Sequence, residues 1–341
     1  MEVRRVQLTG GSSYILTLPK EWINSLKIKK NTPLGIHMQS DGTLLITPKM
    51  MQEQLQRIIE FDTTQTTEQM FLLRRLIGAY IAGYTIIKIT SNTRISETVH
   101  NVVRTFTQTA IGQEVVEETD TSITLKDLLN PIEMPFDRTI KRMHIIVKGM
   151  YEDTIRAFET KDKHLTEDVI QRDTDIDRLH WLVARQYNII LRHVSLAEKM
   201  NITNGTASTC FLISRIIERI GDHVVGIAEN TSTLMKSKID KKIIEQILIA
   251  SNQSLDLFNR SINAFFRKDI KNSNQTIESV AKLEDLCEKI NTMVLNEEGS
   301  IALSVGYIVE SIQRIGEYSQ DISETVINYV IGEEPENKQN C

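Results

Sequence analysis

The stretch that decides the fold is IERIGDHVVGIAEN at residues 217–230, because a second copy, IQRIGEYSQDISET, follows at residues 312–325. The two stretches align at an offset of 95 residues. The paired positions are Arg219 with Arg314, Gly221 with Gly316, Asp222 with Glu317 and Glu229 with Glu324. An internal repeat of this kind predicts a fold built from two like units.

The surrounding sequence, residues 136–331, is predicted to be almost wholly helical, because apolar residues recur at helical spacing with few breakers. Two further helical segments precede each copy of the repeated stretch. They span residues 136–160 and 164–193 before the first copy, and 239–268 and 270–296 before the second. The expected architecture is mostly α, with two tandem three-helix bundles.

Each repeated helix has an apolar line and an acidic line at 100° per residue. The apolar lines are Ile213, Ile217, Ile220, Val224 and Ile227, and Ile308, Ile312, Ile315, Ile322 and Val326. The acids opposite them are Glu218, Asp222 and Glu229, and Glu310, Glu317, Asp321 and Glu324. We therefore expect these carboxylates to point away from each bundle core.

Several of these acids form like-charge pairs four residues apart, each costing roughly 0.2–0.5 kcal/mol in a helix. The pairs are Glu218/Asp222, Glu317/Asp321 and, on the preceding helix of the first copy, Asp173/Asp177, with Glu284/Glu288 as the nearest second-copy equivalent. A cation bound between neighbouring helices would offset the repulsion, and oxygen ligands suit Mg, Ca, Mn or Fe. The alternative is a solvated acidic face.

The motif at 218–223, its copy at 313–318 and the stretch Asp173-Thr174-Asp175-Ile176-Asp177 resemble the signature of the PhoU family. The resemblance implies two three-helix repeats, some with metal clusters, in negative regulators of phosphate uptake. Such regulators act with a phosphate ABC transporter and, in bacteria, a sensor kinase. It also implies a first metal site of Asp173, Asp177, Glu218 and Asp222 and a second with Glu317 and Asp321. This sequence departs from the family pattern at two positions of the second copy. Gln313 replaces an acid, and Glu317 replaces an aspartate.

Two other residue types in the repeated motif have structural explanations. Arg219 and Arg314 each stand beside an acid, so we expect ion pairs rather than phosphate binding. Gly221 and Gly316 lie in mid-helix, where glycine costs about 1 kcal/mol relative to alanine. This cost indicates close helix–helix approach at both positions.

The first fifty residues differ from the rest in charge and pattern. They carry seven Lys and Arg against three acids, a net charge of +4, which leaves −9 for the remainder. Their pattern predicts four short strands and one short helix after Pro19, with a final hairpin around Ser40-Asp41-Gly42. So few elements bury little surface alone, so we expect this module to dimerise.

The stretch at 10–48 resembles the AbrB/SpoVT-type swapped-hairpin domain, in which two copies interlock into one barrel that binds DNA. Strand 13–18 lacks the arginine of many members. DNA contacts would fall to the basic residues Arg4, Arg5, Lys20, Lys27, Lys29 and Lys30. The stretch Gly10-Gly11-Ser12-Ser13 precedes a strand rather than a helix, so it predicts a turn and not a phosphate loop. Head, middle and tail together resemble archaeal phosphate uptake regulators.

The middle of the chain is predicted to be an αβαβ segment. Helices are expected at 68–83 and 94–112, a strand at 84–90 and one or two strands within 114–125. No chemical motif occurs here, which favours a packing or dimerisation unit. The expected domains are 1–50, 51–131, 136–236, 238–331 and a disordered tail at 332–341.

Composition and motifs argue against an enzyme. The 341 residues are 40% hydrophobic and 25% charged, as in soluble globular proteins. Three cysteines without a CxxC motif suit a reducing compartment. There is no long apolar run or signal sequence, so we expect a cytoplasmic protein without membrane insertion. The sequence contains no nucleotide-binding motif, so we expect no organic cofactor.

Three functions remain from the sequence. The first is a DNA-binding transcriptional regulator whose tail senses phosphate status. The second is an adaptor that docks on a phosphate ABC transporter or a kinase and uses its head only to dimerise. The third is a metal-dependent oxidase, which needs two Glu-x-x-His pairs on inward faces, whereas within the predicted helical region 136–331 only Asp177–His180 approximates one.

Overall fold

The computed structural model describes residues 2–38, 42–48, 56–65, 68–192, 194–235 and 237–333. The chain divides into two compact units, Met1–Gln56 and Arg57–Cys341.

The N-terminal unit contains the four strands and one short helix that its sequence predicts. Strands β1 (Gln7–Thr9) and β2 (Ser13–Ile15) form one antiparallel pair, and β3 (Gly35–Met38) and β4 (Leu44–Thr47) form another, with α1 (Lys20–Ser25) between the pairs. Gly10 and Gly11 turn the chain between β1 and β2 with φ of 64° and 82°. The predicted turn, rather than a phosphate loop, is confirmed. Ser40 and Asp41 of the second predicted turn lie outside the described residues.

No side chain described in the N-terminal unit is buried. Large apolar side chains are instead exposed on its strands, including Tyr14 (77% exposed), Ile36 (65%) and Met38 (76%). Isolated two-stranded hairpins are marginally stable at best in water. A single copy of this unit therefore has no hydrophobic core to hold it.

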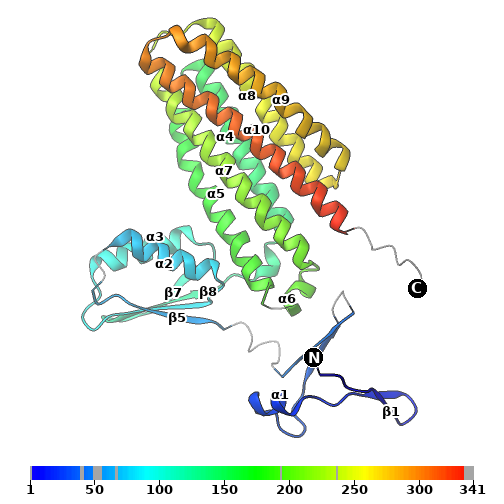
Figure 1. Ribbon diagram of the computed structural model, residues 1–341. Coiled ribbons are helices and arrows are strands. Elements are labelled where there is room, and N and C mark those ends of the chain that lie inside the picture. Colours follow the sequence, from blue (N-terminus) through cyan, green and yellow to red (C-terminus); the bar gives the residue numbers. More distant parts are fainter. Residues whose placement is uncertain are drawn as a thin grey trace. The chain divides into compact units, whose positions relative to one another are not determined.

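The second unit begins with a four-stranded sheet in the order β5-β6-β8-β7. Strands β5 (Ile58–Asp62) and β6 (Ile86–Thr90) are parallel, while β8 (Ser122–Asp127) runs antiparallel to β6 and to β7 (Gln113–Glu118). Helices α2 (Gln69–Ile81) and α3 (Glu97–Thr109) cover one face of the sheet (Figure 1). The predicted αβαβ order was wrong in one respect, because β5 precedes the first helix.

The rest of the unit is helical and built from two groups of three long helices. The first group is α4 (Phe136–Thr160), α5 (Lys163–Ile190) and α7 (Asn204–Leu234), with the short α6 (Val194–Lys199) before α7. The second is α8 (Lys241–Arg267), α9 (Ile270–Met293) and α10 (Gly299–Glu333). Helices α7 and α10 pack against each other between the groups (Figure 1). The ten apolar residues predicted to face the bundle cores are each at most 3% exposed.

A buried ion pair joins the sheet to the first helical group. Arg185 on α5 donates from Nε to Asp127 Oδ2 at 3.0 Å, and its Nη1 donates to the Tyr80 carbonyl oxygen on α2. The Arg185 and Asp127 side chains are 2% and 7% exposed. Asp127 Oδ1 also accepts the backbone N–H of Leu129 at 3.0 Å. Every charged atom of the pair thus has a partner, as a buried ion pair requires.

The ends of the helical region bear on two of the sequence predictions. Helix α10 continues to Glu333, and the remainder of the predicted tail, residues 334–341, lies outside the described residues. Within the described ranges, no helix combines the length and apolar character that a membrane crossing would need. Cys210 and Cys287 are buried free thiols in the helical core.

Candidate functional site: an acidic cluster on the first repeat

Helices α5 and α7 bring the four acids of the predicted first metal site together. Gly221 marks the contact, since a Cβ added there would lie 3.7 Å from Asp173 Oδ1 and 3.7 Å from Ile176 Cγ2. Asp173 on α5 therefore contacts α7 at Gly221, the residue that precedes Asp222. We call Asp173, Asp177, Glu218 and Asp222 the acidic cluster.

The surroundings of the acidic cluster raise the pKa of every member. Partial burial is the main cause and raises the pKa of all four side chains. Burial, then the charges of Asp173 and Asp222, raise the pKa of Asp177 to about 6. Burial, then the charge of Asp222, raise the pKa of Glu218 to about 7. The four carboxylates are therefore close enough to repel one another.

Glu218 differs from the prediction that the acids point to solvent. Its side chain is only 12% exposed; Oε1 accepts from Arg215 Nη1 at 3.1 Å, and Oε2 is buried without a hydrogen-bond partner. The reason is that α7 is packed against α4, α5 and α10, so much of its circumference is covered. Asp222 is exposed, as expected. Arg215 is the counter-ion of this cluster, and its position three residues before Glu218 is the sequence signal that could have identified it.

The acidic cluster contains the type of ligand atom that a cation site needs, but its carboxylates do not point toward one common position. Its possible ligand atoms are all carboxylate oxygens, which hard cations prefer. Glu218 Oε2 has no hydrogen-bond partner and is free to bind a cation. Among the residues that the structure describes, no three His, Cys, Asp or Glu side chains form a group able to hold a metal ion. The side chains would have to turn toward a common point to coordinate one.

The predicted second site is poorer in free carboxylates. Glu317 Oε1 accepts from Gln313 Nε2 at 3.0 Å, and Oε2 accepts from Arg314 Nη1 at 2.7 Å. Burial, then the charges of Glu324 and Glu317, raise the pKa of Asp321. Gln313 stands at the repeat position of Glu218, so the second copy places a neutral amide where the first has an acid. The two halves of the tail are therefore chemically unequal.

The two motif arginines behave differently. Arg314 forms the predicted ion pair with Glu317. For Arg219 the prediction was wrong: it donates to the Tyr318 hydroxyl at 3.4 Å, and its guanidinium carbon lies 5.9 Å from the Tyr318 ring centroid. Arg219 therefore contributes to the packing of α7 on α10 rather than to an ion pair.

The two motif glycines also differ. A Cβ on Gly316 would lie 2.4 Å from Leu283 Cδ2, which confirms the predicted close approach of α10 and α9. At Gly221 the nearest atom, Val147 Cγ2, lies 3.6 Å away, an ordinary contact. Close approach of a neighbouring helix therefore does not explain the glycine at position 221.

His180, three residues after Asp177 on α5, faces the core. It is 5% exposed, and its Nδ1 hydrogen-bonds to Ser214 Oγ at 3.1 Å. Burial is the main cause that lowers its pKa to about 4. His180 is therefore a core residue, and the Asp177–His180 match to a di-iron site carries no support from the geometry.

The basic residues predicted to contact DNA are all exposed: Arg4, Arg5, Lys20, Lys27, Lys29 and Lys30. Arg4 is ion-paired with Glu2 and donates to Thr17 Oγ1 at 3.2 Å. The lysines at 27, 29 and 30 follow α1 closely, with Lys27 in the left-handed conformation. All six side chains are therefore accessible to solvent.

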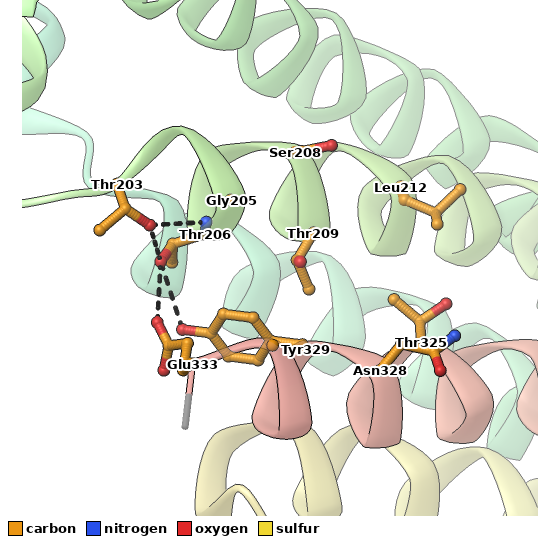
Figure 2. Close-up of a pocket in the computed structure, with 11 residues that line it drawn as sticks. Thr203, Gly205, Thr206, Ser208, Thr209, Leu212, Thr325, Asn328, Tyr329 and Glu333 are labelled. Carbon is orange, nitrogen blue, oxygen red and sulfur yellow. Dashed lines mark hydrogen bonds between the residues drawn. The ribbon is translucent and has the colours of Figure 1, made fainter. Parts of the chain in front are cut away.

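A cavity of about 690 Å³ lies within the second unit, between the start of α7 and the end of α10 (Figure 2). Hydroxyl groups line it, and several hydrogen-bond to one another. Thr206 Oγ1 is 2.8 Å from Thr203 Oγ1, 3.3 Å from the Tyr329 hydroxyl and 3.3 Å from Glu333 Oε1 (Figure 2). Among the described residues that line it there is no Lys, Arg or His, so these residues offer no positive charge for an anion.

Comparison with known proteins identifies both parts of the chain. The model of the PhoU domain matches residues 140–231 and 247–326, just over half of the chain. The model described as "Antidote-toxin recognition MazE, bacterial antitoxin" matches residues 7–53. The second match agrees with the expectation of a small AbrB-like domain at the N-terminus.

Two relatives are described as phosphate-specific transport system accessory proteins, PhoU homologues. The protein from Thermotoga maritima is 24% identical over 195 residues, 55% of this chain and 82% of the relative. The protein from Clostridium acetobutylicum is 20% identical over 200 residues, 57% and 90% of the two chains. The crystal structure of PhoU from Pseudomonas aeruginosa has a similar fold, with a TM-score of 0.52, 18% identity and coverage of 58% of this chain and 96% of that one. The duplicated three-helix tail and the matching family model together place this chain in the PhoU family, with a MazE-like domain ahead of the two repeats.

Proposed function

We propose that the chain regulates phosphate uptake, with an N-terminal domain that binds DNA and a PhoU tail that senses phosphate status or docks on a partner. Two relatives are named as accessory proteins of phosphate-specific transport, which supports a regulatory and not a catalytic role. The residues of the tail that we assign to this role are the acidic cluster.

The observation that carries the DNA-binding part is the coreless, basic N-terminal unit. With no buried side chain and with apolar strands exposed, it needs a second copy to build a core. A dimer would present two sets of the six exposed basic residues on one body. Positive charge concentrated in this way is the usual electrostatic basis of DNA binding.

DNA binding is tested by fluorescence anisotropy of the full chain with DNA from upstream of phosphate-transport genes. We expect the affinity to fall steeply with salt, because neutralised phosphates release counterions. The variant Lys29→Glu/Lys30→Glu should bind more weakly and reduce the slope of log Kd against log salt by about 1 per lost contact.

The control is Lys282→Glu, an exposed lysine on α9. The DNA proposal is abandoned if the full chain gives no binding at low salt, or if the head and α9 variants weaken binding equally. The second result would point to non-specific attraction by the whole molecule.

A second candidate is the adaptor that does not bind DNA, favoured by the transport-system descriptions of the relatives. It predicts crosslinking of the full chain to a phosphate-transport ATPase or a kinase, unchanged in Lys29→Glu/Lys30→Glu. Absence of either partner after crosslinking in phosphate-rich and phosphate-starved cells would count against it.

We also propose that the acidic cluster binds a divalent or iron-type cation. A bound cation would supply positive charge that neutralises the mutual repulsion of Asp173, Asp177, Glu218 and Asp222. The buried and unpartnered Glu218 Oε2 supports this assignment. Glu317 and Asp321 are expected to contribute a weaker second site, because Glu317 is already engaged by Gln313 and Arg314.

Elemental analysis of the purified chain tests the cation site. The variant Glu218→Ala/Asp222→Ala should lose most of the metal that the unmodified protein carries, because it removes half of the acidic cluster. Glu229→Ala, an exposed acid on the same helix, should retain it. Equal metal content in the unmodified protein and the double variant would exclude the site.

A further inference from the structure

The first helices of the two repeats end in the same way. Ala157-Phe158 and Lys161-Asp162 at the end of α4 correspond to Ala264-Phe265 and Lys268-Asp269 at the end of α8. Both lysines adopt the left-handed conformation, with φ of 57° and 53°. A cavity of about 460 Å³ is lined by Phe158 and Lys161, and one of about 260 Å³ by Phe265 and Lys268. The two cavities thus lie at the ends of equivalent helices, although residues of the first repeat also line the cavity at the end of α8.

In the second repeat the lysine is neutralised by the protein itself. Lys268 forms an ion pair with Glu333, and its Nζ lies 5.0 Å from the centroid of the Tyr329 ring. Tyr329 and Glu333 both lie near the end of α10, where they approach Thr206 (Figure 2). The second-repeat cavity therefore has no uncompensated charge on this lysine.

In the first repeat the acid is replaced by another base. At the offset of 95 residues, Leu234 stands at the position of Tyr329 and Lys238 at that of Glu333. Lys161, Lys238 and Lys241 line this cavity, and none forms an ion pair with a residue that the structure describes. The nearest acids in sequence, Asp162 and Asp240, accept backbone N–H groups as helix caps. Three lysines thus share one cavity without a carboxylate partner.

The rest of the first-repeat cavity is apolar, apart from the hydroxyl side chains of Thr231 and Ser237. Its apolar lining is Phe158, Leu234, Met235, Ile239 and Ile244. Thr231 also lines it, is 1% exposed, and its Oγ1 is buried without a hydrogen-bond partner. Buried polar groups are nearly always hydrogen-bonded, so this hydroxyl indicates a missing ligand atom or water.

We propose that this cavity of the first repeat binds a small organic phosphate, of the nucleoside polyphosphate class, with its phosphates at the three lysines and its base against the apolar wall. Lysine binds phosphate as a point charge, and three lysines match a ligand with several negative charges. A cavity of this volume is of the size that holds small organic ligands, and an inorganic phosphate would leave its apolar wall empty. The site shares no residue with the acidic cluster or the basic head.

Isothermal titration of the full chain with adenosine triphosphate tests the proposal, in EDTA and low salt so that the acidic cluster holds no metal. We expect one ATP bound per chain. Lys161→Ala and Lys238→Ala should each weaken binding by about tenfold, because each removes a charge-assisted contact. Thr231→Val should weaken it by several-fold.

Lys268→Ala, the equivalent lysine of the second repeat, is the matched control and should leave ATP binding unchanged. Lys148→Ala, a half-exposed lysine of α4 that is ion-paired with Glu152, is a second control, and thermal melting checks that every variant is folded. Adenosine should not bind, and inorganic phosphate should bind at least tenfold more weakly than ATP.

The proposal is overturned if ATP gives no heat, or if the Lys161→Ala/Lys238→Ala variant binds it as the unmodified protein does. Inorganic phosphate binding as tightly as ATP would refute the role of the apolar wall. Lysine-dependent binding to phosphatidylserine vesicles without ATP binding would assign the lysines to a membrane surface instead. None of these results depends on DNA or metal binding, so this proposal and the proposed function fail separately.

Discussion

Replacing Arg185 by alanine is expected to lower the free energy of unfolding by about 3–5 kcal/mol, because it leaves Asp127 charged and buried without its counter-ion. Arg185 is 2% exposed, donates from Nε to Asp127 Oδ2 at 3.0 Å, and its guanidinium carbon lies 4.8 Å from the Tyr80 ring centroid. Urea denaturation followed by circular dichroism gives the measurement. Asp127→Ala should have a similar effect, since it leaves the arginine unpaired instead.

The exposed pair Lys163–Glu167 provides the control. It has an Nζ–Oε1 distance of 2.7 Å, but both side chains are at least half exposed, so Lys163→Ala should cost less than about 1 kcal/mol. The double variant Arg185→Met/Asp127→Leu should recover much of the loss, because a buried ion pair replaced by apolar side chains of similar volume is often neutral. A loss below about 1 kcal/mol for Arg185→Ala would mean that this pair does not anchor the sheet.

Gly316→Ala and Gly221→Ala are expected to have opposite effects although the two glycines are equivalent in the repeat. The new methyl group at 316 would lie 2.4 Å from Cδ2 of Leu283, a fully buried side chain, and overpacking of this kind costs about 1–3 kcal/mol. At 221 the nearest atom is 3.6 Å away, so the helix propensity of alanine should stabilise the protein by up to about 1 kcal/mol.

Thermal melting of the two variants in EDTA distinguishes these expectations, since metal at the acidic cluster would otherwise affect only Gly221→Ala. The double variant Gly316→Ala/Leu283→Ala is the control, because shortening the leucine makes room for the methyl group and should remove the steric part of the effect. A Gly316→Ala protein that melts as high as Gly221→Ala would show that α9 moves aside at no cost.

Local pattern was sufficient to predict most of the helical fold. The ten isoleucines and valines of the two apolar lines fix which side of α7 and α10 is buried, and all ten are buried. Strand β5 was missed because Ile58–Asp62 is short and its partner, β6, is some 28 residues away, so its stability comes from non-local parallel pairing. Short segments of this kind carry little signal of their own.

The candidate site was predictable in its membership but not in its environment. Repetition and like-charge spacing singled out Asp173, Asp177, Glu218 and Asp222, and the structure brings these four within electrostatic range. A helical wheel compares a residue only with its own helix, so it placed Glu218 in solvent although other helices cover it. Arg219 likewise pairs with Tyr318 instead of the predicted acid. Tyr318 lies on α10, and the local sequence around Arg219 carries no information about that helix.

Helix α5 carries Asp173 and Asp177 near its middle and Arg185 about 12 Å further along, at 1.5 Å per residue from Asp177. One helix thus carries these two carboxylates and also contacts β8 and α2, because Arg185 donates hydrogen bonds to Asp127 and to the Tyr80 carbonyl oxygen. Because one continuous helix makes both contacts, any displacement of α5 at the carboxylates would also act on β8 and α2.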